Sequence, residues 1–323
     1  MDYFAKSDVY FSPITLGTVQ LGLPYGIANS SGQPDMESSR LILDAAIAGG
    51  ITSFDTAPSY GSSELVLGHY FSSKQKPFII SKWSLHDEKP RLTMNELRKQ
   101  LDEVLKERAA RLEVSRIPAL LLHTPLMLKE YGAETTQLLR ESVQDGRIGK
   151  VGVSLGVHVD HELDELWETL QDEIYEIVQI PLNVWDQRLI RTGGLERLRD
   201  SGKQVLARSA YLQGLLFMDE EKLPDHLASA APWLRMLHRL AEIESMTIAE
   251  FAFSYVRYTT GVTSVLIGAE TEGQVRENLR LLNVRPLHEE TRELIRQQFA
   301  NVPEYLITPA LWNVWNKHEG QRS

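Results

Sequence analysis

The stretch Ile51–Gly68, ITSFDTAPSYGSSELVLG, holds a short apolar run that ends on Asp55, followed by a loop with Pro58 and Gly61 that carries Tyr60. Similar short apolar runs recur along the chain. Several are apolar nearly throughout, as expected of parallel strands buried on both faces. The eight predicted strands are Thr15–Val19, Thr52–Asp55, Phe78–Lys82, Ala119–His123, Lys150–Leu155, Ile177–Leu182, Gln204–Arg208 and Ser264–Gly268.

Helical patterns lie between these runs. Helix starts carry capping residues, as in Thr93-x-x-Glu96, and helix ends carry Gly, as at Asp145-Gly146. Eight strands with intervening helices favour an α/β fold of the (β/α)8 TIM-barrel type. The rival Rossmann fold lacks its G-x-G-x-x-G fingerprint, because residues 17–22 read GTVQLG. No linker-like segment interrupts the pattern, so we predict a single barrel domain over residues 1–323.

The composition narrows the class of protein. The 323 residues are 42% hydrophobic and 24% charged, which is ordinary for a large globular domain. A net charge of −10 argues against general nucleic-acid binding. The absence of cysteine excludes Cys-ligated zinc, and the histidines show no metal-ligand spacing, so we predict no metal. No signal peptide or membrane-spanning run of ~20 apolar residues is seen, which predicts a cytoplasmic protein without a membrane partner.

Polar side chains end three consecutive predicted strands. Asp55 ends the second strand and Tyr60 follows it, Lys82 ends the third, and His123 ends the fourth. An unpaired ammonium at the end of a buried strand is costly, so Asp55 is the natural partner for Lys82. Taken singly, Tyr60 is an ordinary loop residue and His123 an ordinary core histidine. Because the carboxyl ends of barrel strands meet at one mouth, the four together predict an acid–base site.

This arrangement resembles the aldo-keto reductase superfamily. The matching residues are Asp55, Thr56, Ala57, Tyr60, Gly61, Glu64, Gly68, Lys82 and His123, followed by the segments Gly146–Ser154, Gln179–Asn183, Arg208–Leu216 and Gly268–Asn278. The resemblance implies an NAD(P)-dependent oxidoreductase that moves hydride between nicotinamide and the carbonyl or alcohol carbon of a small substrate. In that reaction Tyr60 is the general acid–base and His123 orients the carbonyl. Lys82, paired to Asp55, lowers the pKa of Tyr60.

The resemblance also implies a site for NAD or NADP, formed by Thr18, Asp55, Ser154, Gln179, Arg208, Ser209, Leu212, Gly214, Gly268, Glu270, Gln274 and Asn278. Three positions depart from the family pattern. Leu155 follows Ser154 where Asn is common, so one hydrogen bond to the nicotinamide carboxamide is missing or moved. Arg208 stands where a Tyr commonly stacks on nicotinamide, and it can either stack or contact a phosphate or the substrate. Glu270 would repel a 2′-phosphate, which favours NAD, unless it points to solvent at a helix N-terminus.

The substrate is open to two interpretations. Gln20–Asn29 and Arg208–Leu216 resemble a subgroup associated with bacterial sugar and polysaccharide metabolism, so a sugar or polyol is a candidate. The predicted substrate contacts are Tyr25, Trp83, His123, Trp185 and Arg188. The aromatic residues can equally be ordinary lining, and Arg188 a surface residue.

Three further questions stay open at this level. The aromatic segment Leu294–Trp315 either folds over the barrel mouth or packs against a barrel face or a second subunit. The alternative function is a cofactor-binding regulatory or accessory barrel with little turnover, although the complete set of four residues favours catalysis. The sequence is compatible with a monomer or a homo-oligomer.

Overall fold

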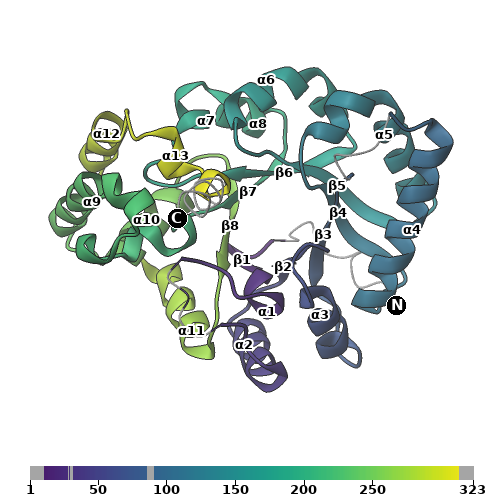
Figure 1. Cartoon of the computed structure of the whole chain (residues 1–323), viewed down its shortest axis with the longest axis horizontal. Coiled ribbons are helices and arrows are strands. Elements are labelled where there is room, and N and C mark those ends of the chain that lie inside the picture. The colour runs from purple at the N-terminus through teal and green to yellow at the C-terminus, as the bar shows by residue number, and fades with distance from the viewer. Residues whose placement is uncertain (1–10, 28, 30–31, 86–90, 313–323) are drawn as a thin grey trace, which may run out of the picture.

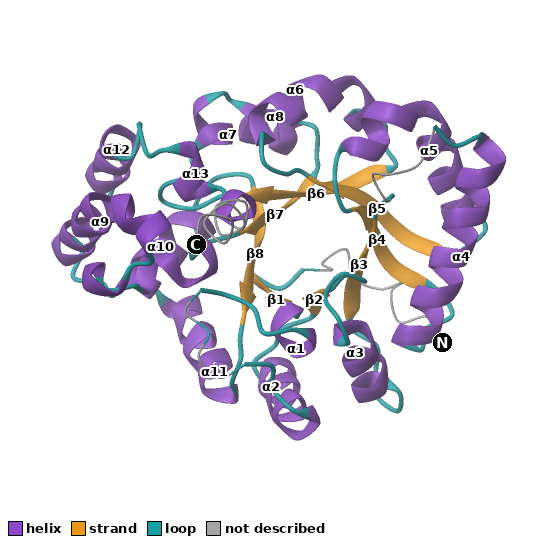
Figure 2. Cartoon of the chain, in the orientation of Figure 1, coloured by secondary structure: helices purple, strands orange, loops and turns teal. Residues whose placement is uncertain are grey.

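Eight parallel strands close into a barrel in sequence order in the computed structural model, which describes residues 11–27, 29, 32–85 and 91–312. The strands are β1 (Ile14–Gly17), β2 (Ser53–Asp55), β3 (Phe78–Trp83), β4 (Ile117–Leu122), β5 (Ile148–Ser154), β6 (Tyr175–Pro181), β7 (Gln204–Arg208) and β8 (Val262–Gly268). Figure 2 shows them as an inner ring enclosed by helices. The predicted barrel is confirmed, and most strands begin one or two residues earlier than the sequence indicated.

Helices connect the strands and cover the outer face of the barrel (Figure 1). They are α1 (Val19–Gly22), α2 (Met36–Ala48), α3 (Ser63–Phe71), α4 (Met94–Leu112), α5 (Leu126–Gln144), α6 (Val159–Leu170), α7 (Arg188–Arg191), α8 (Gly194–Asp200), α9 (Ala231–Ile243), α10 (Ile248–Arg257), α11 (Glu272–Arg280), α12 (Glu289–Gln298) and α13 (Glu304–Ile307). The predicted capping box at Thr93 and Glu96 is present at the start of α4. Among the described residues, no helix is long and apolar enough to cross a membrane.

Apolar side chains fill the lower part of the barrel interior. Phe78 and Ile80 of β3, Ala119 and Leu121 of β4, and Ile177 of β6 belong to one buried cluster. Successive side chains of a strand point to opposite faces, so every second residue continues the inward-facing row. The next inward positions are Lys82, His123 and Gln179, and these polar groups therefore lie on top of the apolar layer.

The loop that carries Tyr60 is held by a close backbone approach between α1 and the start of α3. A Cβ at Gly22 would lie 1.7 Å from the carbonyl oxygen of Tyr60. A Cβ at Gly61 would lie 2.3 Å from the carbonyl oxygen of Gly22, and Gly61 has a φ of +57°. Only glycine fits these two positions without moving the loop, so both glycines help to place Tyr60 at the barrel mouth.

Candidate active site

Asp55 and Lys82 form a buried ion pair at the centre of the site. The Lys82 Nζ lies 2.7 Å from each carboxylate oxygen of Asp55 and donates a further hydrogen bond to the Thr56 carbonyl oxygen at 3.0 Å. The two side chains are only 1% and 2% exposed. The structure thus brings together the pair that the sequence predicted. The ammonium has an acceptor for each of its three protons, which offsets its desolvation cost.

Tyr60 and His123 lie beside this pair. Their rings meet edge to face with centroids 6.3 Å apart, and Lys82 Nζ lies 5.0 Å from the centroid of the Tyr60 ring. Burial raises the pKa of Tyr60, while the positive charge of Lys82 lowers it, the negative charge of Asp55 raises it and the Arg208 guanidinium lowers it. The net direction is upward. Lys82 acts in the predicted direction, but burial outweighs it, so the phenol is protonated at neutral pH and able to donate.

His123 is neutral near pH 7. Burial lowers the pKa of His123 to about 4, and the charges of Lys82 and Arg208 act in the same direction. A neutral imidazole keeps one N–H donor and one acceptor. His123 can therefore donate a hydrogen bond without holding a positive charge of its own.

Three predicted cofactor residues form hydrogen bonds that support Asp55. Gln179 Nε2 donates to Asp55 Oδ1 at 2.9 Å, and Ser154 Oγ donates to Gln179 Oε1 at 3.2 Å. The hydroxyl of Thr18 donates to the Asp55 carbonyl oxygen at 2.8 Å and also lies 2.7 Å from Ser63 Oγ. Since β6 lies opposite β2 in the barrel, the Gln179 contact spans the interior and fixes the carboxylate from the far side.

A cavity of about 850 Å³ opens above these residues at the carboxyl ends of the strands. Its lining includes most of the predicted site, namely Thr18, Tyr25, Asp55, Tyr60, His123, Ser154, Gln179, Arg188, Arg208, Ser209, Gly214, Gly268, Glu270, Gln274 and Asn278. A cavity of this size, with few charged groups on an otherwise mixed lining, is typical of a small-molecule or cofactor site. Lys82 lies beneath the lining, fully buried.

Trp83, Trp185 and Leu212 do not line this cavity, so the structure corrects three sequence predictions. Trp83 follows the inward-facing Lys82 and therefore points outward, where it borders a separate cavity of about 270 Å³ against α4 and α5. Trp185 is 1% exposed and packs near Phe299 of the C-terminal segment, with ring centroids 6.3 Å apart. The Leu212 side chain is fully buried in the core, and the neighbouring Ser209 and Gly214 line the cavity in its place.

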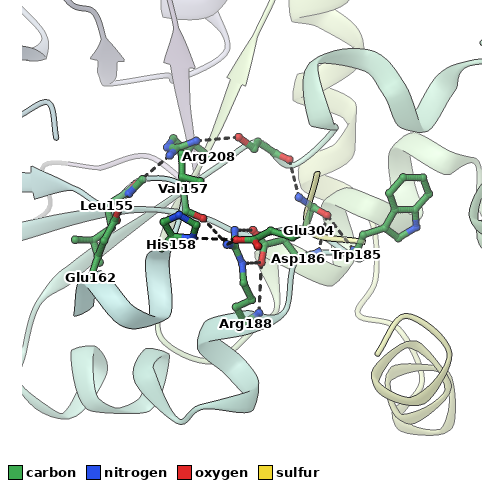
Figure 3. Close-up of polar contacts among 12 residues, drawn as sticks. Leu155, Val157, His158, Glu162, Trp185, Asp186, Arg188, Arg208 and Glu304 are labelled. Carbon is green, nitrogen blue, oxygen red and sulfur yellow. Dashed lines mark hydrogen bonds and ion pairs between the residues drawn. The ribbon is translucent and has the colours of Figure 1, made fainter. Parts of the chain in front are cut away.

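Arg188 lines the cavity, but its guanidinium is already engaged (Figure 3). Its Nε and Nη2 donate to the two carboxylate oxygens of Asp186 at 2.8 and 2.6 Å. Its Nη1 donates to the Val157 carbonyl oxygen at 2.5 Å and lies 3.5 Å from Glu304 Oε1. The side chain is 15% exposed. Arg188 therefore joins the ends of β5 and β6 to α13, and its charge is balanced by a buried carboxylate.

The C-terminal segment folds over the barrel mouth, which was one of the alternatives that the sequence left open. Residues 307–310, which begin three positions after Glu304, line the cavity. The same segment also packs inward, because Leu306 and Trp312 are buried. Trp315 lies outside the described residues. In Figure 1 this part of the chain is the yellow end of the colour scale.

Arg208 differs from Arg188 in having no carboxylate partner among the described residues. Its Nη2 donates to the Leu155 carbonyl oxygen at 2.9 Å, and its Nη1 donates to Ser209 Oγ at 3.2 Å (Figure 3). Leu155 directly follows β5 and Arg208 ends β7, so the guanidinium extends across the end of β6, which lies between them. Arg208 is the cation in the cavity lining whose charge no described carboxylate balances.

The rim formed by β8 and α11 carries carboxylates. Glu270 and Glu277 both line the cavity, and burial raises the pKa of Glu270. The Glu270 backbone N–H donates to Gln274 Oε1 at 2.6 Å, which fixes its position. Among the described residues, the cationic side chains that line the cavity are Arg188 and Arg208. Neither belongs to the β8–α11 rim, because Arg188 follows β6 and Arg208 ends β7.

Sequence reasoning missed several lining residues. Gln20, Tyr211, Phe217, Glu277 and the segment 307–310 line the cavity but were not predicted as site residues. Gln20, Tyr211 and Glu277 fall within or beside segments that had been recognised, so their position was a usable signal. Phe217 directly follows the recognised segment Arg208–Leu216, and residues 307–310 belong to the aromatic segment for which closure over the mouth was one alternative. The sequence did not show that these residues reach the cavity, because that depends on contacts with distant parts of the chain.

Comparison with known proteins agrees with this geometry. Residues 13–298 match the sequence model of the aldo/keto reductase family. The chain is 27% identical to L-glyceraldehyde 3-phosphate reductase of Escherichia coli strain K12, covering 97% of this chain and 94% of that protein. It is 26% identical to the NADH-specific methylglyoxal reductase of the same strain, covering 86% and 92%. The holo form of the aldo-keto reductase AKR11C1 from Bacillus halodurans shares the fold, with a TM-score of 0.71, 21% identity, and coverage of 91% and 94%.

Proposed function

Because this chain belongs to the aldo/keto reductase family and is an NAD(P)-dependent oxidoreductase, we propose that Tyr60 is its general acid–base and a sugar or polyol its substrate. The observation that carries the proposal is the cluster of Asp55, Lys82, Tyr60 and His123 on the cavity floor. An accessory barrel with little turnover would gain nothing from keeping a buried ion pair beside a half-buried phenol that lines the cavity.

The proton is the part of the reaction that the chain itself handles. The bound cofactor supplies or accepts the hydride. In reduction, the Tyr60 hydroxyl gives its proton to the carbonyl oxygen of the substrate, and in oxidation the ionised phenol takes the proton of the alcohol. The negative charge left on Tyr60 faces the Lys82 ammonium. Neutral His123 donates a hydrogen bond to the same substrate oxygen and orients it.

The cavity fits a nicotinamide dinucleotide. Gln20 Oε1 is buried, lines the cavity and has no hydrogen-bond partner among the described residues. Ser154 presents a hydroxyl and Gln179 presents an amide for the nicotinamide end of the cofactor. The side chain of Leu155 cannot form a hydrogen bond there. The Ser209–Gly214 loop and the Gly268–Asn278 rim continue the lining and would hold the remainder of the cofactor.

A sugar or polyol substrate is supported by the residues that line the cavity. Tyr25, Tyr211 and Phe217 offer aromatic faces, and Thr124 offers a hydroxyl. Aromatic rings stack on the apolar faces of sugars, while hydroxyls bind their polar edges. The two curated relatives are named for small carbonyl substrates, one of which is a sugar phosphate.

The substrate class can be tested by mixing the purified protein with NADH or NADPH and a panel of aldoses, ketoses and simple aldehydes, and with NAD or NADP and polyols. With hydroxylated substrates we expect the nicotinamide to be oxidised or reduced, and its absorbance measures this change. Turnover confined to simple aldehydes would refute the sugar or polyol assignment. Cofactor binding without turnover across the panel would favour the accessory role.

We also propose that the cofactor is NAD(H). Glu270 and Glu277 place two carboxylates on the β8–α11 rim, and no lysine or arginine of the described lining stands there to bind a 2′-phosphate. A like charge opposite an anionic group disfavours that ligand. The name of one relative, an NADH-specific reductase, points the same way.

Replacing Glu270 with Lys is expected to shift the ratio of kcat/KM for NADPH and NADH by about tenfold or more toward NADPH, because a cation replaces the repelling carboxylate. Glu270→Gln, which removes the charge without adding a cation, should give an intermediate ratio. The ratio is measured with one substrate at fixed ionic strength. A parent protein that already prefers NADPH would rule out the NAD(H) proposal.

A further inference from the structure

The charges around Tyr60 do not cancel. The ionisable groups that touch it or share the cavity with it come from different elements: Tyr25 after α1, Asp55 of β2, Lys82 of β3, His123 after β4 and Arg208 of β7. Asp55 and Lys82 neutralise each other at 2.7 Å. His123 and Tyr25 are neutral near pH 7, because burial lowers the pKa of His123 to about 4 and raises the pKa of Tyr25. The net charge of the cluster is therefore the single positive charge of Arg208.

The position of Arg208 keeps this charge at the reacting end of the cavity. Its hydrogen bond to the Leu155 carbonyl oxygen draws the guanidinium away from the β8–α11 rim. The two bonds that it makes, to Leu155 and Ser209, use two of its five N–H groups. The other N–H groups have no partner among the described residues, so the charge is not committed to a structural ion pair.

We propose that the Arg208 guanidinium supplies the uncompensated positive charge that stabilises ionised Tyr60, which makes Arg208 a positioning residue for proton transfer. The inference rests on the proposed role of Tyr60. A close ion pair acts on its surroundings as a dipole, whose field falls off faster than that of a single charge. Lys82 has the larger influence on the pKa of Tyr60, but its field is partly cancelled by Asp55, whereas no carboxylate among the described residues cancels the field of Arg208. Consistently, the charge of Arg208 lowers the pKa of both Tyr60 and His123.

Two matched variants separate charge from shape. Arg208→Gln removes the charge and keeps an N–H donor for the Leu155 carbonyl oxygen. Arg208→Lys keeps the charge but replaces the planar guanidinium with an ammonium group. We expect the Gln variant to raise the pKa of Tyr60 by about one, which lowers alcohol oxidation about tenfold at pH values below that pKa. The Lys variant should stay close to the parent. The kinetic pKa comes from the pH dependence of kcat/KM for oxidation, and cofactor Kd is measured separately by fluorescence quenching.

A titration without cofactor or substrate gives an independent readout. The absorbance of tyrosinate is followed with pH in the parent and in Tyr60→Phe, and the difference isolates Tyr60 from the other ten tyrosines of the chain. The same difference in the Arg208→Gln background should be shifted to higher pH. If that variant does not fold, Arg208→Met is titrated in its place.

An unchanged Tyr60 titration in the Gln variant overturns the inference. Weakened cofactor binding with an unchanged titration would mean that Arg208 only contacts the cofactor. These outcomes differ from failure of the proposed function, which would appear as near-normal turnover in Tyr60→Phe itself. The titration of the cofactor-free protein decides the role of Arg208 whether or not a substrate has been found.

Discussion

Replacing Tyr60 with Phe is expected to lower turnover by about 10²–10⁴-fold while leaving cofactor Kd largely unchanged. The substitution removes one hydroxyl, and with it the only proton that the site delivers to the substrate oxygen. The aromatic ring, its edge contact with His123 and the buried Asp55–Lys82 pair are retained. The measurement is steady-state turnover together with cofactor titration by fluorescence.

Tyr258→Phe provides a matched control for this prediction. Tyr258 lies on the outer shell, 40% exposed, and its hydroxyl donates to the Val284 carbonyl oxygen at 2.8 Å. The Tyr258→Phe variant also loses one phenol hydroxyl, but outside the cavity, so its turnover should match that of the parent protein. Near-normal turnover in Tyr60→Phe would remove Tyr60 from the proton-transfer role.

Replacing Lys82 with Met is expected to lower the free energy of unfolding by about 3–5 kcal/mol and to abolish activity. The substitution leaves the Asp55 carboxylate, which is 2% exposed, without its ammonium partner. An uncompensated charge in that position is costly, and Tyr60 also loses its nearest cation. Urea denaturation measures the stability, and turnover is measured at a temperature where the variant is folded.

The double variant Lys82→Met with Asp55→Asn separates the two effects. Removing the second charge should restore much of the lost stability, but activity should stay absent because the proton-transfer site lacks its pair. Lys74→Met is the exposed control, since Lys74 pairs with Asp44 at 3.4 Å and is 44% exposed, and it should cost less than about 1 kcal/mol. A Lys82→Met protein as stable as the control would show that the pair carries no buried-charge penalty.

The fold was readable from the sequence because its signals are local and repeated. Apolar runs of strand length alternate with helical patterns along the chain. Parallel strands that are buried on both faces are apolar nearly throughout, which makes them visible in the sequence. Within a strand the alternation of side chains places Lys82, His123 and Gln179 above Phe78, Ala119 and Ile177. The same rule places Trp83 outside the barrel, so that prediction failed through a signal that was available in the sequence.

The partners of the charged residues were only partly readable. Asp55 was predicted for Lys82 because a buried ammonium requires a counter-charge. Arg188, by contrast, is neutralised by a neighbour in sequence, Asp186, and also joins Val157 to Glu304 across a long sequence separation. No pattern in the sequence indicates whether an arginine at a strand end is balanced, like Arg188, or unbalanced, like Arg208.

Patterns in the sequence were thus enough to predict the barrel and the meeting of Asp55, Tyr60, Lys82 and His123 at its mouth, because strand-like runs repeat along the chain and the carboxyl ends of barrel strands come together. The direction of the Tyr60 pKa became evident from the folded chain alone, since burial outweighs the charge of Lys82. The tertiary structure likewise decided that residues 307–310 close the mouth and that Arg208 keeps a free charge. Burial and long-range pairing depend on distances between segments far apart in the chain, and these distances exist only after folding.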